Sequence, residues 1–283
     1  SHRLYPTNYG DFQDKVDAII KNVRDNGDKA VFDYTAQFDK AEINADNILV
    51  TEEEIKEAYE EVDDELIKVI RKAIKNIRDF HEKQIQKSWF ETREDGVMLG
   101  QKVTPMETCG VYVPGGKAVY PSSVLMNIVP AHVAGVKNII MTTPPGKDGK
   151  VTANTLVAAK EAGATKVYKV GGAQAIAAMA FGTESIPKVD KIVGPGNIFV
   201  ALAKKAVYGN VSIDSIAGPS EILVLADETA NPRYVAADLL SQAEHDEMAS
   251  AILVTTSEEL AHKVSDEIDG FLNQLSRKEI MEK

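Results

Sequence analysis

Three glycine-containing loops have the residue types that most clearly suggest ligand chemistry in this sequence. Each loop follows a short apolar run and precedes a stretch of helical character; the loops are Pro114-Gly115-Gly116, Gly171-Gly172-Ala173-Gln174 and Gly194-Pro195-Gly196-Asn197. Glycines ahead of a helix leave backbone N–H groups accessible at the positive end of the helix dipole, where a pyrophosphate can bind. The same glycines could instead serve only to make tight turns between strand and helix. The residues alone leave both interpretations open, although three such loops favour the ligand.

The usual dinucleotide fingerprint, Gly-x-Gly-x-x-Gly, is poorly matched by these loops. The segment GPGNIF has glycine at two of the three places and Phe199 at the third. Asp214 lies eighteen residues after Gly196, close to the spacing of an acid that binds a ribose hydroxyl, but the sequence VSIDS favours the end of a strand. A nucleotide would therefore bind here in some other way than the fingerprint mode.

A second polar group lies in the segment DLLSQAEHDE. Gln242 and His245 are three residues apart, so on a helix they share a face and could reach one metal ion. Glutamine is an uncommon zinc ligand and two ligands do not complete a site, so the spacing alone favours a surface pair. Just upstream, Ser220 stands at a turn before an apolar run, where its hydroxyl could bind a polar substrate group or cap the turn.

The composition excludes several classes of protein. With 44% hydrophobic and 27% charged residues in 283, the chain is typical of a globular protein of about two domains. The net charge of −11 argues against a nucleic-acid partner, and no apolar run is long enough for a membrane span. A single cysteine, Cys109, cannot form an internal disulfide, and the N-terminus lacks the apolar stretch of a signal peptide. The expected location is the cytoplasm.

The N-terminal part of the chain is predicted to be helical. From residue 11 to about 86, apolar residues recur at helical spacing, Gly27 has the position of a C-cap, and Thr51-Glu52-Glu53-Glu54 has the spacing of a capping box. Short β-prone runs over 89–103, broken by Gly96, predict a hairpin or crossing ribbon, in which Trp89 is expected to pack.

The rest of the chain alternates between strand and helix patterns. Strands are predicted at 110–113, 138–143, 166–170 and 190–193, with helices at 122–135, 151–163 and 173–181 between them. A smaller repetition follows, with strands at 221–226 and 250–256 and helices at 231–244 and 258–275. Alternation of this kind predicts an α/β fold with two open, mostly parallel sheets, whose ligands bind at the carboxyl ends of the strands.

Domain boundaries are expected near Glu107 and near 217–220. Residues 1–106 then form the N-terminal helical part of a first domain, residues 107–219 a second α/β domain, and residues 220–283 a return to the first domain.

Four long motifs, in this order and at these separations, closely resemble histidinol dehydrogenase. They are GVYVPGGKAVYPSSVLMNIVPAHVAGV, VGGAQAIAAMAFGTESIPKVDKIVGPGN, IAGPSEILVLAD and DLLSQAEH, and the resemblance runs from about Val23 to the end of the chain. It implies an oxidoreductase of histidine biosynthesis that oxidises L-histidinol to L-histidine through histidinaldehyde, in two NAD-dependent steps. It also implies one zinc ion per site, a domain-swapped homodimer and sheets of incomplete dinucleotide-binding type.

The resemblance also implies roles for individual residues. Tyr112, Gln174 and Asn197 match positions that contact NAD, which makes residues 107–219 the NAD-binding domain. Gln242 and His245 match zinc ligands that also touch the substrate, and Ser220 matches a substrate contact, so that residues 220–283 form the substrate and zinc side. Zinc would hold the amino and imidazole nitrogens of histidinol and so orient it. Cys109 matches no functional position and is expected to be a small buried hydrophobe.

One departure from the family bears on activity. Members of the family continue beyond the motifs matched here, with a Glu-His pair that moves protons and an Asp and a His that complete the zinc site; none of these motifs occurs in this sequence. The resemblance therefore assigns no catalytic residue to the chain, which looks truncated and is expected to be inactive alone. The alternative is a fragment that binds a nucleotide or another small molecule without turnover.

Overall fold

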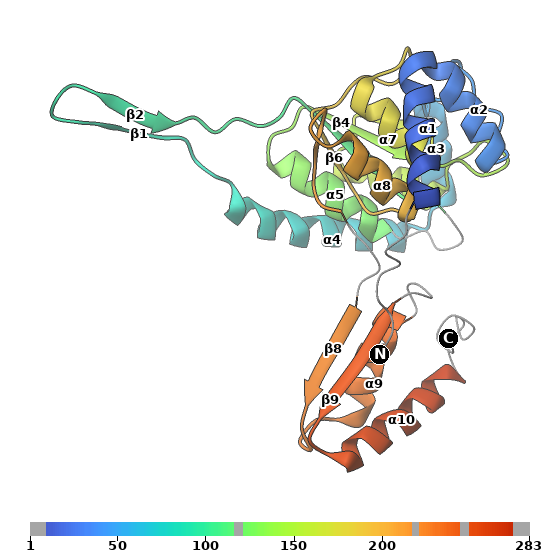
Figure 1. Ribbon diagram of the computed structural model, residues 1–283, viewed down its shortest axis with the longest axis vertical. Coiled ribbons are helices and arrows are strands. Elements are labelled where there is room, and N and C mark those ends of the chain that lie inside the picture. The colour runs from blue at the N-terminus through green and yellow to red at the C-terminus, as the bar shows by residue number, and fades with distance from the viewer. Residues whose placement is uncertain (1–9, 116–120, 217–220, 244–248, 274–283) are drawn as a thin grey trace. The chain divides into compact units, whose positions relative to one another are not determined.

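The computed structural model describes residues 10–115, 121–216, 221–243 and 249–273. The chain divides into two compact units, Ser1–Ile216 and Ala217–Lys283, and each has apolar cores of its own (Figure 1).

The larger unit is built on a five-stranded parallel sheet with the order β5-β4-β3-β6-β7. The strands are β3 (Thr108–Tyr112), β4 (Asn138–Thr143), β5 (Lys166–Lys169), β6 (Lys191–Val193) and β7 (Ser212–Ile213). Val111 of the central strand lies opposite Met141 on one side and Val193 on the other. The first strand of this sheet, β3, lies at its centre. The next two strands, β4 and β5, are added on one side, and β6 and β7 follow on the other side of β3, so the topological switch point lies between β3 and β6.

Helices cover both faces of this sheet in two tiers. The inner helices are α5 (Pro121–Val133) and α6 (Ala153–Ala162) on one face, and α7 (Gly172–Phe181) and α8 (Ile198–Val207) on the other. In the outer tier, α1 (Gly10–Asn26) and α2 (Asp28–Phe38) pack on the second pair, and α3 (Glu52–Glu61) and α4 (Asp64–His81) pack on the first. The N-terminal helices thus share cores with the sheet, whereas the sequence pattern placed them in a separate domain. Their predicted association with residues 220–283 stays a prediction.

Local signals in the sequence explain where the outer helices begin and end. Gly27, with φ of 54°, separates α1 from α2. Thr51 accepts a hydrogen bond from the amide of Glu54, whose carboxylate accepts one from the amide of Thr51, so the predicted capping box is confirmed. Just before this cap, Leu49 pairs with Tyr168 in an antiparallel bridge, which ties the segment after α2 to the edge strand β5.

A β-hairpin follows α4 and a short 3-10 turn, η1 (Glu82–Gln84). Strands β1 (Trp89–Thr92) and β2 (Met98–Gln101) pair antiparallel, and Gly96 has a φ of 81° in the turn between them. The hairpin matches the predicted one, but every residue of its two strands is exposed. The expectation that Trp89 packs is therefore wrong: its indole is exposed and donates to Gln101 from across the hairpin.

The smaller unit contains a parallel pair of strands, β8 (Glu221–Ala226) and β9 (Ser250–Thr255). Helices α9 (Pro232–Ala243) and α10 (Glu258–Leu272) pack against it around buried Val235, Leu239 and Leu260. With parallel strands in both units and a helical N-terminal segment, the predicted α/β fold class is confirmed.

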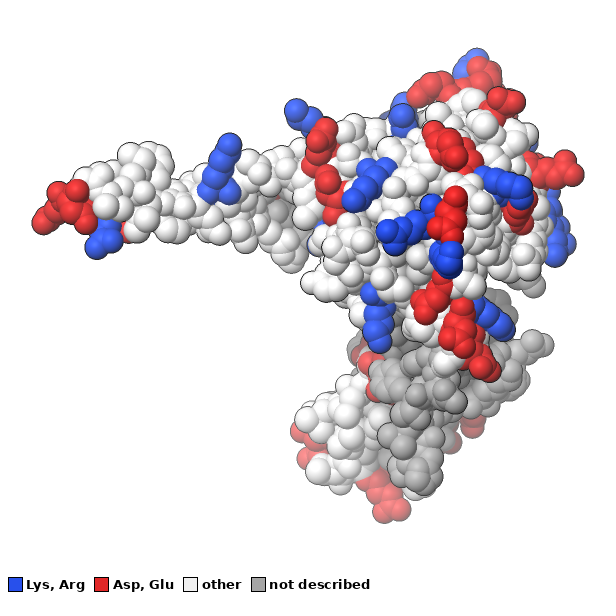
Figure 2. Space-filling view, turned by 45° about the horizontal axis from the view of Figure 1, so that its top comes forward, with Lys and Arg blue, Asp and Glu red and all other residues white. Residues whose placement is uncertain are grey.

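Charged side chains of both signs are interspersed over the face shown in Figure 2. Several form pairs at helical spacing, such as Lys21 with Asp25 and Lys29 with Asp33. In the part of the chain that the structure describes, no helix is both long and apolar enough to cross a bilayer.

Candidate functional site

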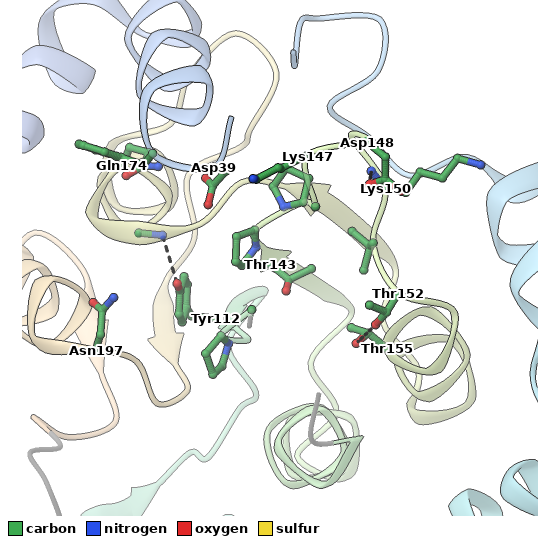
Figure 3. Close-up of a pocket in the computed structure, with 18 of the residues that line it drawn as sticks. Asp39, Tyr112, Thr143, Lys147, Asp148, Lys150, Thr152, Thr155, Gln174 and Asn197 are labelled. Carbon is green, nitrogen blue, oxygen red and sulfur yellow. Dashed lines mark hydrogen bonds between the residues drawn. The ribbon is translucent and has the colours of Figure 1, made fainter. Parts of the chain in front are cut away.

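A cavity of about 1210 Å³ opens at the carboxyl ends of the strands in the larger unit (Figure 3). Its lining includes residues from the loops after β3, β4 and β6 and from the first turn of α7, which follows β5, and it spans the switch point between β3 and β6. All three residues predicted to contact NAD line this cavity: Tyr112, Gln174 and Asn197. An open α/β sheet is expected to bind its ligand at this place.

Tyr112 ends the central strand and is 3% exposed. Its hydroxyl accepts a hydrogen bond from the amide of Gly172 at 3.1 Å, the contact dashed in Figure 3. Burial raises the pKa of Tyr112 to about 12; the Gly172 amide opposes this rise and the charge of Asp39 adds to it. Tyr112 is therefore a neutral phenol at physiological pH that fixes the start of α7.

Gln174 lies in the first turn of α7 and is 1% exposed. Its Oε1 is buried and has no hydrogen-bond partner. Gly172 makes room for this amide: its φ is 65°, and a Cβ there would come within 2.5 Å of Gln174 Oε1. A buried acceptor without a partner costs about 1–3 kcal/mol, so its position in a cavity wall indicates a ligand that donates to it.

Asn197 is the N-cap of α8. Its Oδ1 accepts from the amides of Phe199 at 3.1 Å and Val200 at 3.2 Å, which fixes the side chain beside the cavity. The amide nitrogen of the same side chain is a donor that capping does not require. Asn197 can therefore cap the helix and contact a ligand at once.

The loop between β6 and Asn197 is held from both sides at Gly194. The buried Lys204 donates to the carbonyl of Gly194 at 2.9 Å, and Asp214 accepts from its amide at 2.9 Å. Lys204 and Asp214 also form an ion pair. Burial by itself would raise the pKa of Asp214, but the hydrogen bonds from Lys204 and from the amides of Gly194 and Ser215 lower it overall. Asp214, which resembled a ribose-binding acid by its spacing, thus holds a loop.

Two of the glycine loops are explained partly by close packing. A Cβ on Gly115 or Gly171 would collide with the side chain of Pro144, which follows β4. Glycine is therefore required at both positions whether or not a ligand binds, so the tight-turn interpretation is also supported at these loops.

Sequence reasoning missed two groups of residues that line the cavity. One is the loop 144–150, which contributes Lys147, Asp148 and Lys150; its sequence, PPGKDGK, directly follows a strand and could have been recognised as a fourth loop at the same edge. The other is Phe38 with Asp39, at the end of α2. Asp39 Oδ2 is buried without a hydrogen-bond partner, and burial raises the pKa of its carboxyl. No motif marks these two residues.

The residues predicted for zinc and substrate are only partly described. Gln242 is half-buried in the last turn of α9, in the smaller unit, while Ser220 and His245 lie outside the described residues. Within the described ranges, no three His, Cys, Asp or Glu side chains come together as a metal site would require.

Cys109 lies in β3 and is 4% exposed in the core. Burial raises the pKa of its thiol to about 11, which keeps it protonated at neutral pH and unsuited to act as a nucleophile. It is the small buried hydrophobe that the sequence predicted.

Comparison with known proteins gives consistent matches. A family model described as histidinol dehydrogenase matches residues 5–283. Histidinol dehydrogenase from Halalkalibacterium halodurans is 59% identical over 95% of this chain and 63% of its own length. That from Bacillus subtilis is 61% identical over 94% of the chain and 62% of its own length. The chain therefore spans somewhat less than two thirds of these relatives.

A crystal structure agrees with these sequence relatives. The structure of histidinol dehydrogenase from Elizabethkingia anophelis superposes with a TM-score of 0.90 at 44% identity, covering 95% of this chain and 62% of that one. The sheet with its switch-point cavity, the family model and the relatives in sequence and structure lead to one assignment. The chain belongs to the histidinol dehydrogenase family.

Proposed function

We propose that this chain forms the NAD-binding part of a histidinol dehydrogenase. The whole enzyme would oxidise L-histidinol to L-histidine through histidinaldehyde, the last step of histidine biosynthesis. The observation that carries the proposal is the buried, unpartnered Oε1 of Gln174 in the wall of the switch-point cavity. Family membership supports the same function, since the relatives that match are named for it.

The cavity fits NAD by the chemistry of its lining. Tyr112, Gln174 and Asn197 would contact the dinucleotide, and the glycine loops at Gly115 and Gly172 bring backbone close to it. Lys147 and Lys150 line the same cavity and can balance the charge of a pyrophosphate. When bound, NAD would supply the hydride acceptor for both oxidation steps. The residues of this chain would bind and orient it.

Zinc and substrate binding are proposed from the resemblance. Gln242 and His245 would ligate zinc and touch histidinol, and Ser220 would contact the substrate. Among these three residues only Gln242 is described, and a single neutral amide is a weak zinc ligand. The described residues therefore do not by themselves fit a zinc site.

We also propose the cellular setting from the sequence. The single, buried Cys109 suits a reducing compartment such as the cytoplasm. A homodimer is expected from the family. The acidic net charge of −11 disfavours a nucleic-acid partner, and no membrane association is proposed.

The 283-residue chain by itself should bind NAD without oxidising histidinol at a useful rate. General acid and base groups typically contribute roughly 10² to 10⁴ in rate each, and the Glu-His pair of the family has no counterpart among these residues. Formation of NADH from NAD and histidinol at a rate close to that of a relative would contradict this part of the proposal.

The NAD proposal is tested by Gln174→Leu. This substitution removes an acceptor that has no partner in the free protein, so the melting temperature without ligand should stay equal or rise. The Kd for NAD, measured by calorimetric titration, should rise about tenfold or more because a buried hydrogen bond to the ligand is lost. Gln86→Leu, at an exposed position outside the cavity, is the matched control and should bind NAD as the unmodified chain does.

Two results would contradict the proposal. The first is an unmodified chain that shows no NAD binding at millimolar concentration. The second is a Gln174→Leu variant that folds and binds NAD with unchanged affinity.

A further inference from the structure

The cavity has a second buried acceptor that no predicted role explains. In the described part of the chain, the buried side-chain oxygens without a hydrogen-bond partner are Gln174 Oε1 and Asp39 Oδ2, and both residues line the cavity. In the view of Figure 3, the Asp39 carboxylate lies between Gln174 and Lys147. An unsatisfied carboxylate oxygen in a native structure is costly, so this one calls for a donor that the protein itself does not supply.

The fold brings Asp39 to the cavity by a specific route. Helix α2 ends at Phe38, Asp39 is its C-cap, and Lys40 has a φ of 59°, which turns the chain sharply. The segment that follows runs along the edge strand: Lys169 donates to the carbonyl of Ile48 at 2.8 Å, and Val50 donates to that of Val167 at 2.9 Å. This pairing fixes the end of α2 beside the carboxyl end of the sheet.

Asp39 is a better candidate for a ligand contact than Asp214. Both Asp214 oxygens accept hydrogen bonds from within the protein, from the amides of Gly194 and Ser215, and the carboxylate is also paired with Lys204. Asp39 forms no ion pair among the described residues. Phe38, its neighbour in sequence, is 50% exposed and lines the same cavity, so the lining includes one aromatic ring as well as the carboxylate.

We propose that Asp39 accepts hydrogen bonds from the adenosine ribose hydroxyls of NAD and selects NAD over NADP. This inference rests on the proposed NAD site. A carboxylate can accept from both hydroxyls of a ribose, and Phe38 offers an aromatic surface for the adjoining adenine. NADP has a phosphate in place of one hydroxyl proton, which removes a donor and sets a dianion against the carboxylate.

Lys147 and Asp148 make it possible to distinguish a direct contact between the Asp39 carboxylate and the ribose from a general effect of charge in the cavity. Lys147 lines the same cavity and would attract a phosphate of either dinucleotide. Asp148 also lines the cavity, but its Oδ1 already accepts from the amide of Lys150 at 3.1 Å. Asp148→Asn therefore makes the same change of charge in the same cavity without removing an unpartnered acceptor.

The experiment compares Kd values for NAD and NADP on the 283-residue chain with Asp39→Asn, Asp39→Ala and Asp148→Asn. The unmodified chain should bind NAD more tightly than NADP. Asp39→Asn should lower the ratio of the two affinities by about 10- to 100-fold, because a charge-assisted hydrogen bond to NAD is weakened and a repulsion against NADP is removed. Asp148→Asn should leave the ratio within about twofold of that of the unmodified chain. Neither Asp39 variant should melt below the unmodified chain without ligand, since the acceptor removed has no partner there.

The possible outcomes separate this inference from the proposed function. If the unmodified chain binds neither dinucleotide, the NAD site itself is wrong and the inference falls with it. If the chain binds NAD and Asp39→Asn keeps the same ratio of affinities, Asp39 does not select the cofactor, although the NAD site stands. An equal change of ratio in Asp148→Asn would likewise overturn the inference, since net charge alone would then explain the preference. If Asp39→Ala does not fold, the ratio of affinities measured for Asp39→Asn still tests the inference.

Discussion

Asn197 combines a structural and a proposed ligand role in one side chain. Its Oδ1 caps α8 by accepting from two backbone amides, while its amide nitrogen stays available to NAD. Loss of an N-cap costs about 0.5–2 kcal/mol, so replacement by alanine would change stability and binding together. Serine caps helices about as well as asparagine but lacks the amide N–H₂ group. The two roles can therefore be separated.

We predict that Asn197→Ser keeps the unfolding free energy within about 0.5 kcal/mol of that of the unmodified chain, whereas Asn197→Ala loses about 1 kcal/mol. Both variants should bind NAD more weakly, each by a similar factor. Urea denaturation gives the first comparison and calorimetric titration the second. NAD affinity retained in Asn197→Ser but lost in Asn197→Ala would show that only the cap matters for binding.

At the scale of elements, the β6–α8 turn depends on the contacts that hold Gly194. The carbonyl of Gly194 accepts a hydrogen bond from Lys204 of α8, and its amide donates one to Asp214, which directly follows β7. These two hydrogen bonds fix the turn at Gly194. Gly194 also has a φ of 115°, and a Cβ there would collide with the carbonyl of Tyr112. This turn therefore lies close against β3 at the switch point, and Asn197, which follows the turn, lines the cavity.

We predict that Asp214 stabilises the fold in a pH-dependent way. Its pKa is lower in the folded than in the unfolded chain, so the unfolded state binds the proton more readily and stability rises with pH. The difference in unfolding free energy between the unmodified chain and Asp214→Asn should be fully present above about pH 4. It should disappear as the pH falls through the lower folded-state pKa.

Urea denaturation of both proteins between pH 7 and pH 2.5 measures this difference. Asp14→Asn, at an exposed position on α1, is the matched control and should show little effect at any pH. The opposite result is a difference in unfolding free energy between the unmodified chain and Asp214→Asn that stays constant down to the lowest pH. That result would contradict the assignment of the Asp214 carboxylate as the group that titrates.

At the scale of the whole molecule, the described residues that line the cavity all come from the larger unit. Its described lining runs from Ile19 to Phe199, whereas the core of the smaller unit is built from residues such as Leu239 and Leu260. Each unit has its own apolar cluster. NAD binding should therefore depend on the first unit alone.

We predict that Leu239→Ala destabilises the smaller unit without weakening NAD binding. A buried leucine reduced to alanine costs about 2–5 kcal/mol, which should appear as faster amide hydrogen exchange in α9 and α10. The Kd for NAD should stay within about twofold, because Leu239 is remote in sequence and absent from the cavity lining. The comparison variant Ile128→Ala, in the core of the larger unit, should speed exchange there instead. A large loss of NAD affinity in Leu239→Ala would show that the two units are coupled.

The sequence by itself determined much of the fold and part of the site. Alternating apolar runs and helical patterns predicted the strands from Thr108 to Val193 and the helices between them, because the periods of strand and helix are local properties of the chain. The glycine loops predicted the edge at which Tyr112, Gln174 and Asn197 now line one cavity. The resemblance predicted the family, since its motifs are long and ordered.

Other features were decided only by tertiary structure. Asp39 reaches the cavity because the segment after α2 pairs with β5, about 120 residues further along the chain, and no local pattern encodes such a pairing. Asp214 has nearly the sequence spacing of an acid that binds a ribose hydroxyl. In the fold, however, its oxygens accept hydrogen bonds from the amides of Gly194 and Ser215 and pair with Lys204. Whether a carboxylate is free for a ligand depends on which donors the folded chain places around it, and that is a property of three-dimensional packing rather than of spacing.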